Sequence, residues 1–176
     1  MNLPNKLTLL RILLIPVFII TMMFDFSNHY LISCLIFIIA SITDALDGHI
    51  ARKNNLVTDF GKFMDPLADK LLVISALICM IESNLVAGWM VIIIVARELT
   101  VSILRAIAAA DGKVIAASGG GKIKTISQMI AIIVLLLGAN LNNNLLLQIG
   151  TIFILIATFF TLYSGLFIQK QRFIYE

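Results

Sequence analysis

Charged residues, histidine and cysteine are all scarce in this sequence. Only 13% of the 176 residues are charged, whereas 60% are hydrophobic. This composition lies well outside the range of soluble globular domains and predicts a multi-pass membrane protein. The two cysteines, Cys34 and Cys79, lie within apolar runs, where free cysteine behaves as a small hydrophobic residue. The sequence therefore predicts neither a disulfide framework nor a cysteine-based metal site.

The sequence also lacks the basic pattern that nucleic-acid binding requires. Its formal net charge is +3, but no basic stripe or recognition motif accompanies that charge. We therefore expect no nucleic-acid partner, and we attribute the positive charge to basic residues that flank membrane segments.

Six apolar segments divide the chain, and each is close to the roughly 20 residues with which a helix crosses a bilayer core. They predict an all-α fold of six transmembrane helices in one domain, residues 1–176. The predicted segments are Leu7–Phe24, His29–Ala51, Gly61–Ile81, Val86–Ala109, Ile123–Ala139 and Leu145–Ile168.

Basic residues flank alternate ends of these segments. The connections 25–28, 82–85 and 140–144 contain no lysine or arginine. Since short cytoplasmic loops accumulate these residues, the opposite ends are predicted to face the cytoplasm. We expect a protein of the cell membrane with both termini and a polar interfacial cavity on the cytoplasmic side. The basic residues on that side include Lys6, Arg52, Lys53, Lys62, Lys113, Lys122, Lys124, Lys170 and Arg172.

The stretch 44–69 contains five of the ten acidic residues, and four of these have helical spacing. Asp44 and Asp47 lie three residues apart near the end of one predicted helix. Asp65 and Asp69 lie four residues apart on the next predicted helix, so each pair shares one helix face. If the two helices form an antiparallel hairpin, the pairs converge. Small residues that permit close approach of a backbone or a ligand lie beside them: Gly48, Ala51 and Gly61.

Four converging carboxylates at a membrane edge cannot all stay ionised without compensating cations. An all-oxygen ligand set favours hard ions, so we expect two divalent cations, Mg²⁺ or Mn²⁺. Paired metal ions are typical of in-line phosphoryl displacement. The alternative is that the acids pair with basic residues of the same region, namely Arg52, Lys53, Lys62 and Lys70.

This stretch resembles the complete signature of the CDP-alcohol phosphatidyltransferase family. Every fixed position has the same residue and spacing: Asp44, Asp47, Gly48, Ala51, Arg52, Gly61, Asp65 and Asp69. A wider likeness, from about Leu3 to Thr125, is to one bacterial branch of that family. It includes the run 3–8, Arg11, Pro16, Arg97, Glu98, Arg105 and the run 121–125.

The resemblance implies transfer of a phosphatidyl group from CDP-diacylglycerol to an alcohol, with release of CMP. In the bacterial branch the alcohol is sn-glycerol 3-phosphate. The resemblance also implies that Asp44, Asp47 and Asp65 hold two metal ions, with Asp69 near the second ion and acting as general base. It further implies a homodimer among membrane lipids. The residues expected to bind the CDP-lipid are Gly48, Ala51, Arg52, Gly61, Asn5 and Thr8.

An acceptor that carries a phosphate needs basic side chains in the same cavity. The candidates are Arg105, Lys122 and Lys124, with Lys62 and Arg97 behind them. Two other interpretations stay open. Arg97 can instead pair with its neighbour Glu98, and the lysines can instead attract anionic lipid headgroups.

Arg11 and a glycine run have two interpretations each. Arg11 either extends its guanidinium to the interface or faces the site with a phosphate contact. The run 118–122, Ser-Gly-Gly-Gly-Lys, suggests a phosphate-binding loop, but Ile123 follows the lysine and no strand precedes the run. We therefore predict a flexible hinge there.

Two alternative functions remain. The same signature suits a family member with another acceptor, such as inositol phosphate, serine or phosphatidylglycerol, because it handles only the shared CDP-lipid. A cation transporter also uses intramembrane acids, but it is expected to carry them near the bilayer midplane with access from both sides.

Overall fold

The computed structural model describes residues 3–53, 59–110 and 119–175, and every element within these ranges is a helix. Side chains are described for fewer residues, and most of those between 44 and 66 are outside that set. The helices are α1 (Leu3–Met23), α2 (His29–Lys53), α3 (Asp59–Glu82), α4 (Gly88–Ala110), α5 (Gly119–Asn140) and α6 (Asn144–Tyr175).

Each of the six predicted segments is a helix, so the all-α prediction is confirmed. The largest differences are at three helix ends, because α1 begins at Leu3, α5 begins at Gly119 and α6 continues to Tyr175. A helix satisfies its own backbone hydrogen bonds, so long apolar runs adopt this form where water is absent.

Within the residues that the structure describes, three helices are long and apolar enough to cross a membrane. The qualifying stretches are Lys6–Met23 in α1, Gly120–Asn140 in α5 and Asn144–Gly165 in α6, and α2 contributes a shorter apolar stretch, His29–Thr43. Large apolar side chains such as Phe159 also face outward, as expected where lipid replaces water. These features identify a membrane protein, and the number of six crossings stays a prediction.

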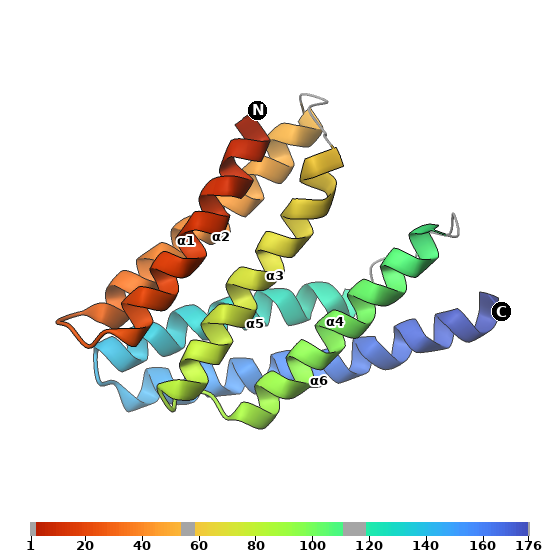
Figure 1. The fold of residues 1–176 in the computed structure, drawn as a ribbon. Helices are drawn as coiled ribbons and strands as arrows, with labels where there is room; N and C mark the ends of the chain where they lie inside the picture. Colours follow the sequence, from red (N-terminus) through yellow and green to blue (C-terminus); the bar gives the residue numbers. More distant parts are fainter. Residues whose placement is uncertain (1–2, 54–58, 111–118, 176) are drawn as a thin grey trace.

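The helices form a bundle with two unlike ends. At one end, three short turns join successive helices, at residues 24–28, 83–87 and 141–143; we call this the tight-turn end. The opposite end holds the beginning of α3 and α5 and the last turns of α2 and α4; we call this the charged end. Figure 1 shows α1, α2 and α3 leaning away from α4 and α6 toward the charged end.

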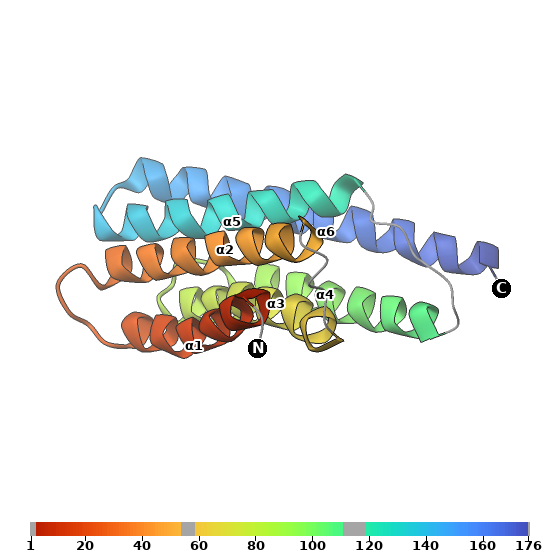
Figure 2. The same ribbon diagram turned by 90° about the horizontal axis from the view of Figure 1, so that it is seen from above.

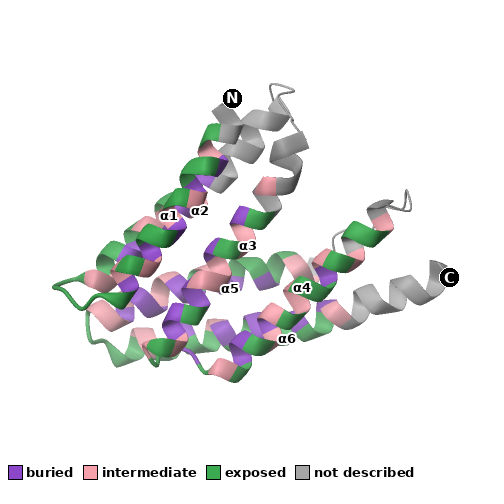
Figure 3. Ribbon diagram, in the orientation of Figure 1, coloured by how far each residue is buried: buried purple, intermediate pink, exposed green. Residues whose placement is uncertain are grey.

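Packing is closest between α5 and α6 and between α1 and its neighbours α2 and α3. Figure 2 shows α2 lying between α1 and the α5–α6 pair, and α2 contacts α5. The apolar core includes Phe18 and Phe37, whose ring centroids are 6.2 Å apart, and the fully buried Leu77, Ile132 and Leu136. Figure 3 shows many buried positions of the described chain toward the tight-turn end.

The glycine run does not form the predicted hinge, because Gly119–Gly121 form the first turn of α5. The physical reason is close packing on α6. A Cβ atom added to Gly120 would lie 3.5 Å from Ser164 Cβ and 3.5 Å from Tyr163 Cδ1. Tertiary contact with α6 thus outweighs the low helix propensity of glycine.

Candidate active site

The four aspartates of the 44–69 stretch lie on the two helices predicted for them. Asp44 and Asp47 are in the last turns of α2, Asp65 is in the second turn of α3, and Asp69 is one turn further, toward the middle of α3. Since α2 and α3 are consecutive and in contact, the backbone agrees with an antiparallel hairpin. The side chains of Asp44, Asp47 and Asp65 are outside the described set, so the structure locates the carboxylate of Asp69 alone among the four.

Asp69 lines a small hollow, about 30 Å³ in volume, between three helices. The hollow brings the end of the acidic stretch together with residues far along the chain. Its lining comes from α3 (Asp69, Lys70, Val73 and Ile74), α4 (Glu98) and α5 (Lys124, Thr125 and Gln128).

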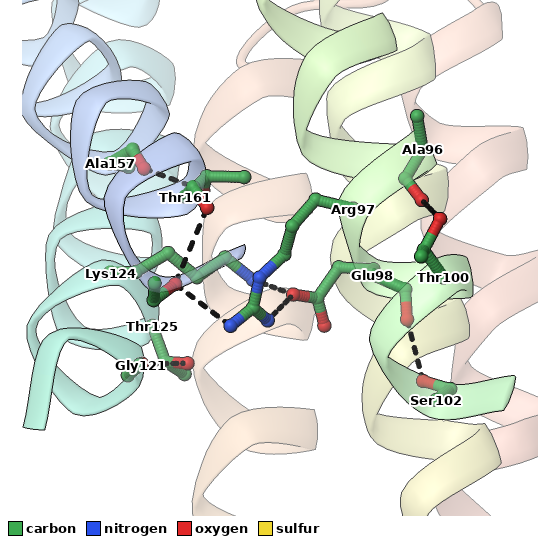
Figure 4. Close-up of polar contacts among 11 residues, drawn as sticks. Ala96, Arg97, Glu98, Thr100, Ser102, Gly121, Lys124, Thr125, Ala157 and Thr161 are labelled. Atoms are coloured by element: carbon green, nitrogen blue, oxygen red, sulfur yellow. Dashed lines mark hydrogen bonds and ion pairs between the residues drawn. The ribbon is translucent and has the colours of Figure 1, made fainter. Parts of the chain in front are cut away.

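Glu98 is the centre of a charge network that links α4, α5 and α6. Its Oε1 atom lies 2.8 Å from Lys124 Nζ and 2.8 Å from Arg97 Nη1. Arg97 Nη2 donates a hydrogen bond of 2.8 Å to Ser164 Oγ on α6. Figure 4 shows the Arg97, Glu98 and Lys124 side chains converging between the helices. Long side chains therefore connect helices around the hollow.

This network is largely removed from solvent. The side chains of Arg97, Glu98 and Lys124 are 14%, 15% and 6% exposed. Burial of charge is costly, so each ion must have partners. Two cations face the Glu98 carboxylate, and the Asp69 carboxylate lines the same hollow as the buried charge of Lys124. An anion that enters beside Lys124 would gain more from that charge than it would in water.

Among the predicted acceptor-binding residues whose side chains are described, Lys124 alone lines the hollow. Lys124 lines the hollow beside Asp69, whereas Lys122 is exposed and is not part of the lining. Arg97 pairs with Glu98, which is the alternative that the sequence left open. The side chains of Arg105 and Lys62 lie outside the described set.

The predicted CDP-lipid residues are mostly in the undescribed part of the molecule. Thr8 is described, and it is fully buried on α1. Arg11, one turn further along α1, is also fully buried. A guanidinium that reached the interfacial water would be exposed, so the interfacial interpretation of Arg11 is wrong. The other predicted residues, whose side chains are not described, are Asn5, Gly48, Ala51, Arg52 and Gly61.

Sequence reasoning did not assign Gln128, Thr125, Lys70 or Glu98 to the site as lining residues. The signal for Gln128 was available, because it follows Lys124 by four residues and so shares its helix face. The local sequence pattern does not predict that Lys70 and Glu98 line the hollow, because their position there depends on how α3 and α4 pack.

A broader depression lies at the tight-turn end, away from these charges. It is lined by the first turns of α6, through Asn144, Leu147, Gln148, Thr151 and Ile152. It has no ionisable lining residue, so it offers no acid or base for catalysis.

The protein is thus a membrane protein of the all-helical class, with an acidic helix pair and a buried ion network. Within that class, the chain belongs to the CDP-alcohol phosphatidyltransferase family, whose family model matches residues 1–163.

Named relatives match most of the chain. A Bacillus subtilis protein named CDP-diacylglycerol–glycerol-3-phosphate 3-phosphatidyltransferase is 49% identical over 177 residues, which cover 93% of this chain and 91% of the relative. A Rickettsia bellii protein of the same name is 43% identical over 165 residues, with the same two coverages. A Mycobacterium tuberculosis protein named probable phosphatidylglycerophosphate synthase is 42% identical over 134 residues, covering 74% of this chain and 64% of that protein.

Proposed function

We propose that this protein transfers the phosphatidyl group of CDP-diacylglycerol to sn-glycerol 3-phosphate, which yields phosphatidylglycerophosphate and CMP. The names of relatives that match 93% of the chain support this activity. The structural observation that carries it is the hollow in which Asp69, a signature acid, lies with the buried cation Lys124. A base and an anion-binding group in one place suit an acceptor with both a hydroxyl and a phosphate.

Asp69 is the proposed general base. Its carboxylate takes the proton of the acceptor hydroxyl as the hydroxyl oxygen forms a bond to the lipid-linked phosphorus. The bond between that phosphorus and the CMP oxygen breaks, and CMP leaves with the bonding electrons. A base must lie within hydrogen-bond reach of its proton, and the partial burial of Asp69 beside the hollow favours this role.

Asp44, Asp47, Asp65 and Asp69 are the proposed ligands of two divalent cations, Mg²⁺ or Mn²⁺. The donor chemistry fits, because all four are carboxylates on two packed helices at one end of the bundle. When bound, such ions neutralise charge on the pyrophosphate of the CDP-lipid. Gly48, Ala51, Arg52, Gly61, Asn5 and Thr8 stay the proposed CDP-lipid residues.

Lys124 is the principal proposed contact for the acceptor phosphate. It is in the second turn of α5. Glu98 holds Lys124 in place through the 2.8 Å ion pair. Arg105 and Lys122, with Lys62 and Arg97 behind them, complete the proposed basic set.

The proposed location is the cytoplasmic membrane, with both termini and the charged end on the cytoplasmic side. The absence of lysine and arginine from the three turns of the tight-turn end supports this orientation. A soluble phosphate ester and a membrane-bound nucleotide can then reach the same end. A homodimer is the proposed assembly.

The test is an assay of the purified full-length protein with CDP-diacylglycerol, Mg²⁺ or Mn²⁺ and a panel of alcohols. We expect CMP release with sn-glycerol 3-phosphate and none without a divalent cation. CMP release with inositol phosphate, serine or phosphatidylglycerol, but not with sn-glycerol 3-phosphate, would reject the proposed acceptor. Metal-dependent ion flux in proteoliposomes that survives Asp69→Asn would favour transport instead.

A further inference from the structure

Gln128 has a buried polar group without a partner. The residue is 2% exposed, and its Nε2 atom has no hydrogen-bond partner within the part of the chain that the structure describes. A buried amide donor that stays unsatisfied is unfavourable, and buried polar groups in proteins almost always find partners. The Gln128 amide is thus placed to bind a group that the described side chains do not supply.

The position of Gln128 indicates which group that is. Gln128 lines the same hollow as Asp69 and Lys124. It follows Lys124 by one helical turn, a rise of roughly 6 Å along α5. The three side chains therefore present a carboxylate, an ammonium and an amide to one small space. The hollow, about 30 Å³ in volume, has room for one small polar group, such as a single hydroxyl of a larger compound.

We propose that the Gln128 side-chain amide donates a hydrogen bond to the central hydroxyl of the acceptor and so selects a glycerol phosphate. This assignment rests on the proposed function, since it takes Asp69 as the base and Lys124 as the phosphate contact. In this arrangement the C2 hydroxyl enters the hollow beside Gln128, while the phosphate at C3 is on the Lys124 side and the C1 hydroxyl is on the Asp69 side. Gln128 takes no part in proton transfer, so its effect is on discrimination between acceptors.

An ordered water molecule is the other occupant that the amide would accept. The two occupants predict different kinetics. A water that only satisfies Gln128 has no reason to distinguish acceptors, whereas a direct contact with the C2 hydroxyl must favour the acceptor that carries it.

The experiment compares two acceptors in the full-length protein with CDP-diacylglycerol and Mg²⁺. One is sn-glycerol 3-phosphate and the other is 3-hydroxypropyl phosphate, which lacks only the C2 hydroxyl. For the unmodified protein we expect kcat/KM to favour glycerol 3-phosphate by about 10-fold to 100-fold. In Gln128→Met, which keeps the size but removes the donor, we expect that preference to fall to about 3-fold or less, with an unchanged KM for CDP-diacylglycerol.

Gln148→Met is the matched control, because Gln148 is exposed on α6 at the tight-turn end. It should keep the preference of the unmodified protein. Gln128→Glu is a second variant, which preserves shape and polarity but replaces the donor with acceptor oxygens beside Lys124. It should lose the preference as well, so the test does not depend on a folded Met variant.

An unchanged preference in both folded Gln128 variants would overturn the assignment, as would an unmodified protein that uses the two acceptors equally. Failure of the proposed function looks different. In that case the unmodified protein would release no CMP with either acceptor while another alcohol supports release.

Discussion

The two ends of the bundle differ in the kind of interaction that they contain. At the tight-turn end, each of the three turns contains an asparagine with positive φ, namely Asn28 at 63°, Asn84 at 57° and Asn142 at 48°. Asparagine tolerates this left-handed conformation better than most residues, so the turns can be short. Toward the charged end, between the middle of α4 and the beginning of α5, Glu98 is instead buried with two cations. The tight-turn end thus favours close packing. The charged end contains buried charges, which are unfavourable for stability, beside the proposed active site.

The contacts at the two ends also differ in chemical kind, since those at one end are apolar and those at the other are polar. At the tight-turn end, short turns join successive helices, and apolar core side chains from several helices meet directly. At the charged end, Lys124 and Glu98 meet across 26 positions of sequence, and Arg97 reaches Ser164 on α6. Changes at the charged end should therefore affect substrate handling, whereas changes at the tight-turn end should affect stability alone.

The largest expected effect is that of Asp69→Asn at the charged end. Loss of the general base should lower kcat by about 10²-fold to 10⁴-fold. The protein should stay folded, because the amide has nearly the same shape. Steady-state CMP release and thermal unfolding in detergent measure the two properties. Asp25→Asn, at the exposed tight-turn end, is the control and should leave turnover unchanged; near-normal turnover in Asp69→Asn would remove Asp69 from the base role.

Glu98→Gln should have the next largest effect, since it removes the carboxylate shared by Lys124 and Arg97. Breaking a buried ion pair from one side costs roughly 3 kcal/mol of unfolding free energy, because the remaining charges lose their partner. We also expect a higher KM for sn-glycerol 3-phosphate, since Lys124 is no longer held at the hollow.

Chemical unfolding and the acceptor KM test this pair of effects together. Glu82→Gln is the control, because Glu82 is exposed at the end of α3, and its effect should stay within about 0.5 kcal/mol. If Glu98→Gln matched that control in both measurements, the network would have no role in stability or in acceptor binding.

Gly150→Ala should destabilise the tight packing between α5 and α6. A Cβ atom at Gly150 would lie 2.5 Å from Leu135 Cγ and 3.2 Å from the Leu135 backbone nitrogen. Such overpacking costs about 2 kcal/mol. Thermal unfolding should shift downward while kcat at low temperature stays the same. Gly88→Ala, where the nearest atom is 3.9 Å away, should show no comparable loss; equal stability of the two variants would contradict the packing argument.

The smallest expected effect is that of Asn142→Ala in the turn between α5 and α6. Alanine in the left-handed conformation costs about 1 kcal/mol relative to a residue that tolerates it. Asn142→Gly should recover that stability, because glycine has no Cβ atom. Unfolding free energies of the two variants give the comparison, and equal values would show that backbone conformation at Asn142 does not limit the turn.

Much of the fold was predictable, because apolar length is a local property. The six helices follow from runs of apolar residues separated by polar turns, and all six are present. The glycine run at Gly119–Gly121 was predicted wrongly as a hinge, since helix propensity in water says nothing of packing on α6. The candidate site was predictable to the extent that Asp69 and Lys124 were named. Spacing along α5 could have added Gln128, which shares a helix face with Lys124, but the position of Glu98 at the hollow does not follow from spacing along one helix.

Composition and spacing along the chain are sufficient for the membrane class, the helical elements and the acidic signature, because all three depend on residues that are close in sequence. The small hollow, the pairing of Lys124 with Glu98, the burial of Arg11 and the unsatisfied amide of Gln128 depend on how separate helices pack. A contact between distant helices reflects the balance of apolar packing against desolvation of charge over the whole bundle. That balance exists only in the folded molecule, and it determines which polar groups remain for a substrate.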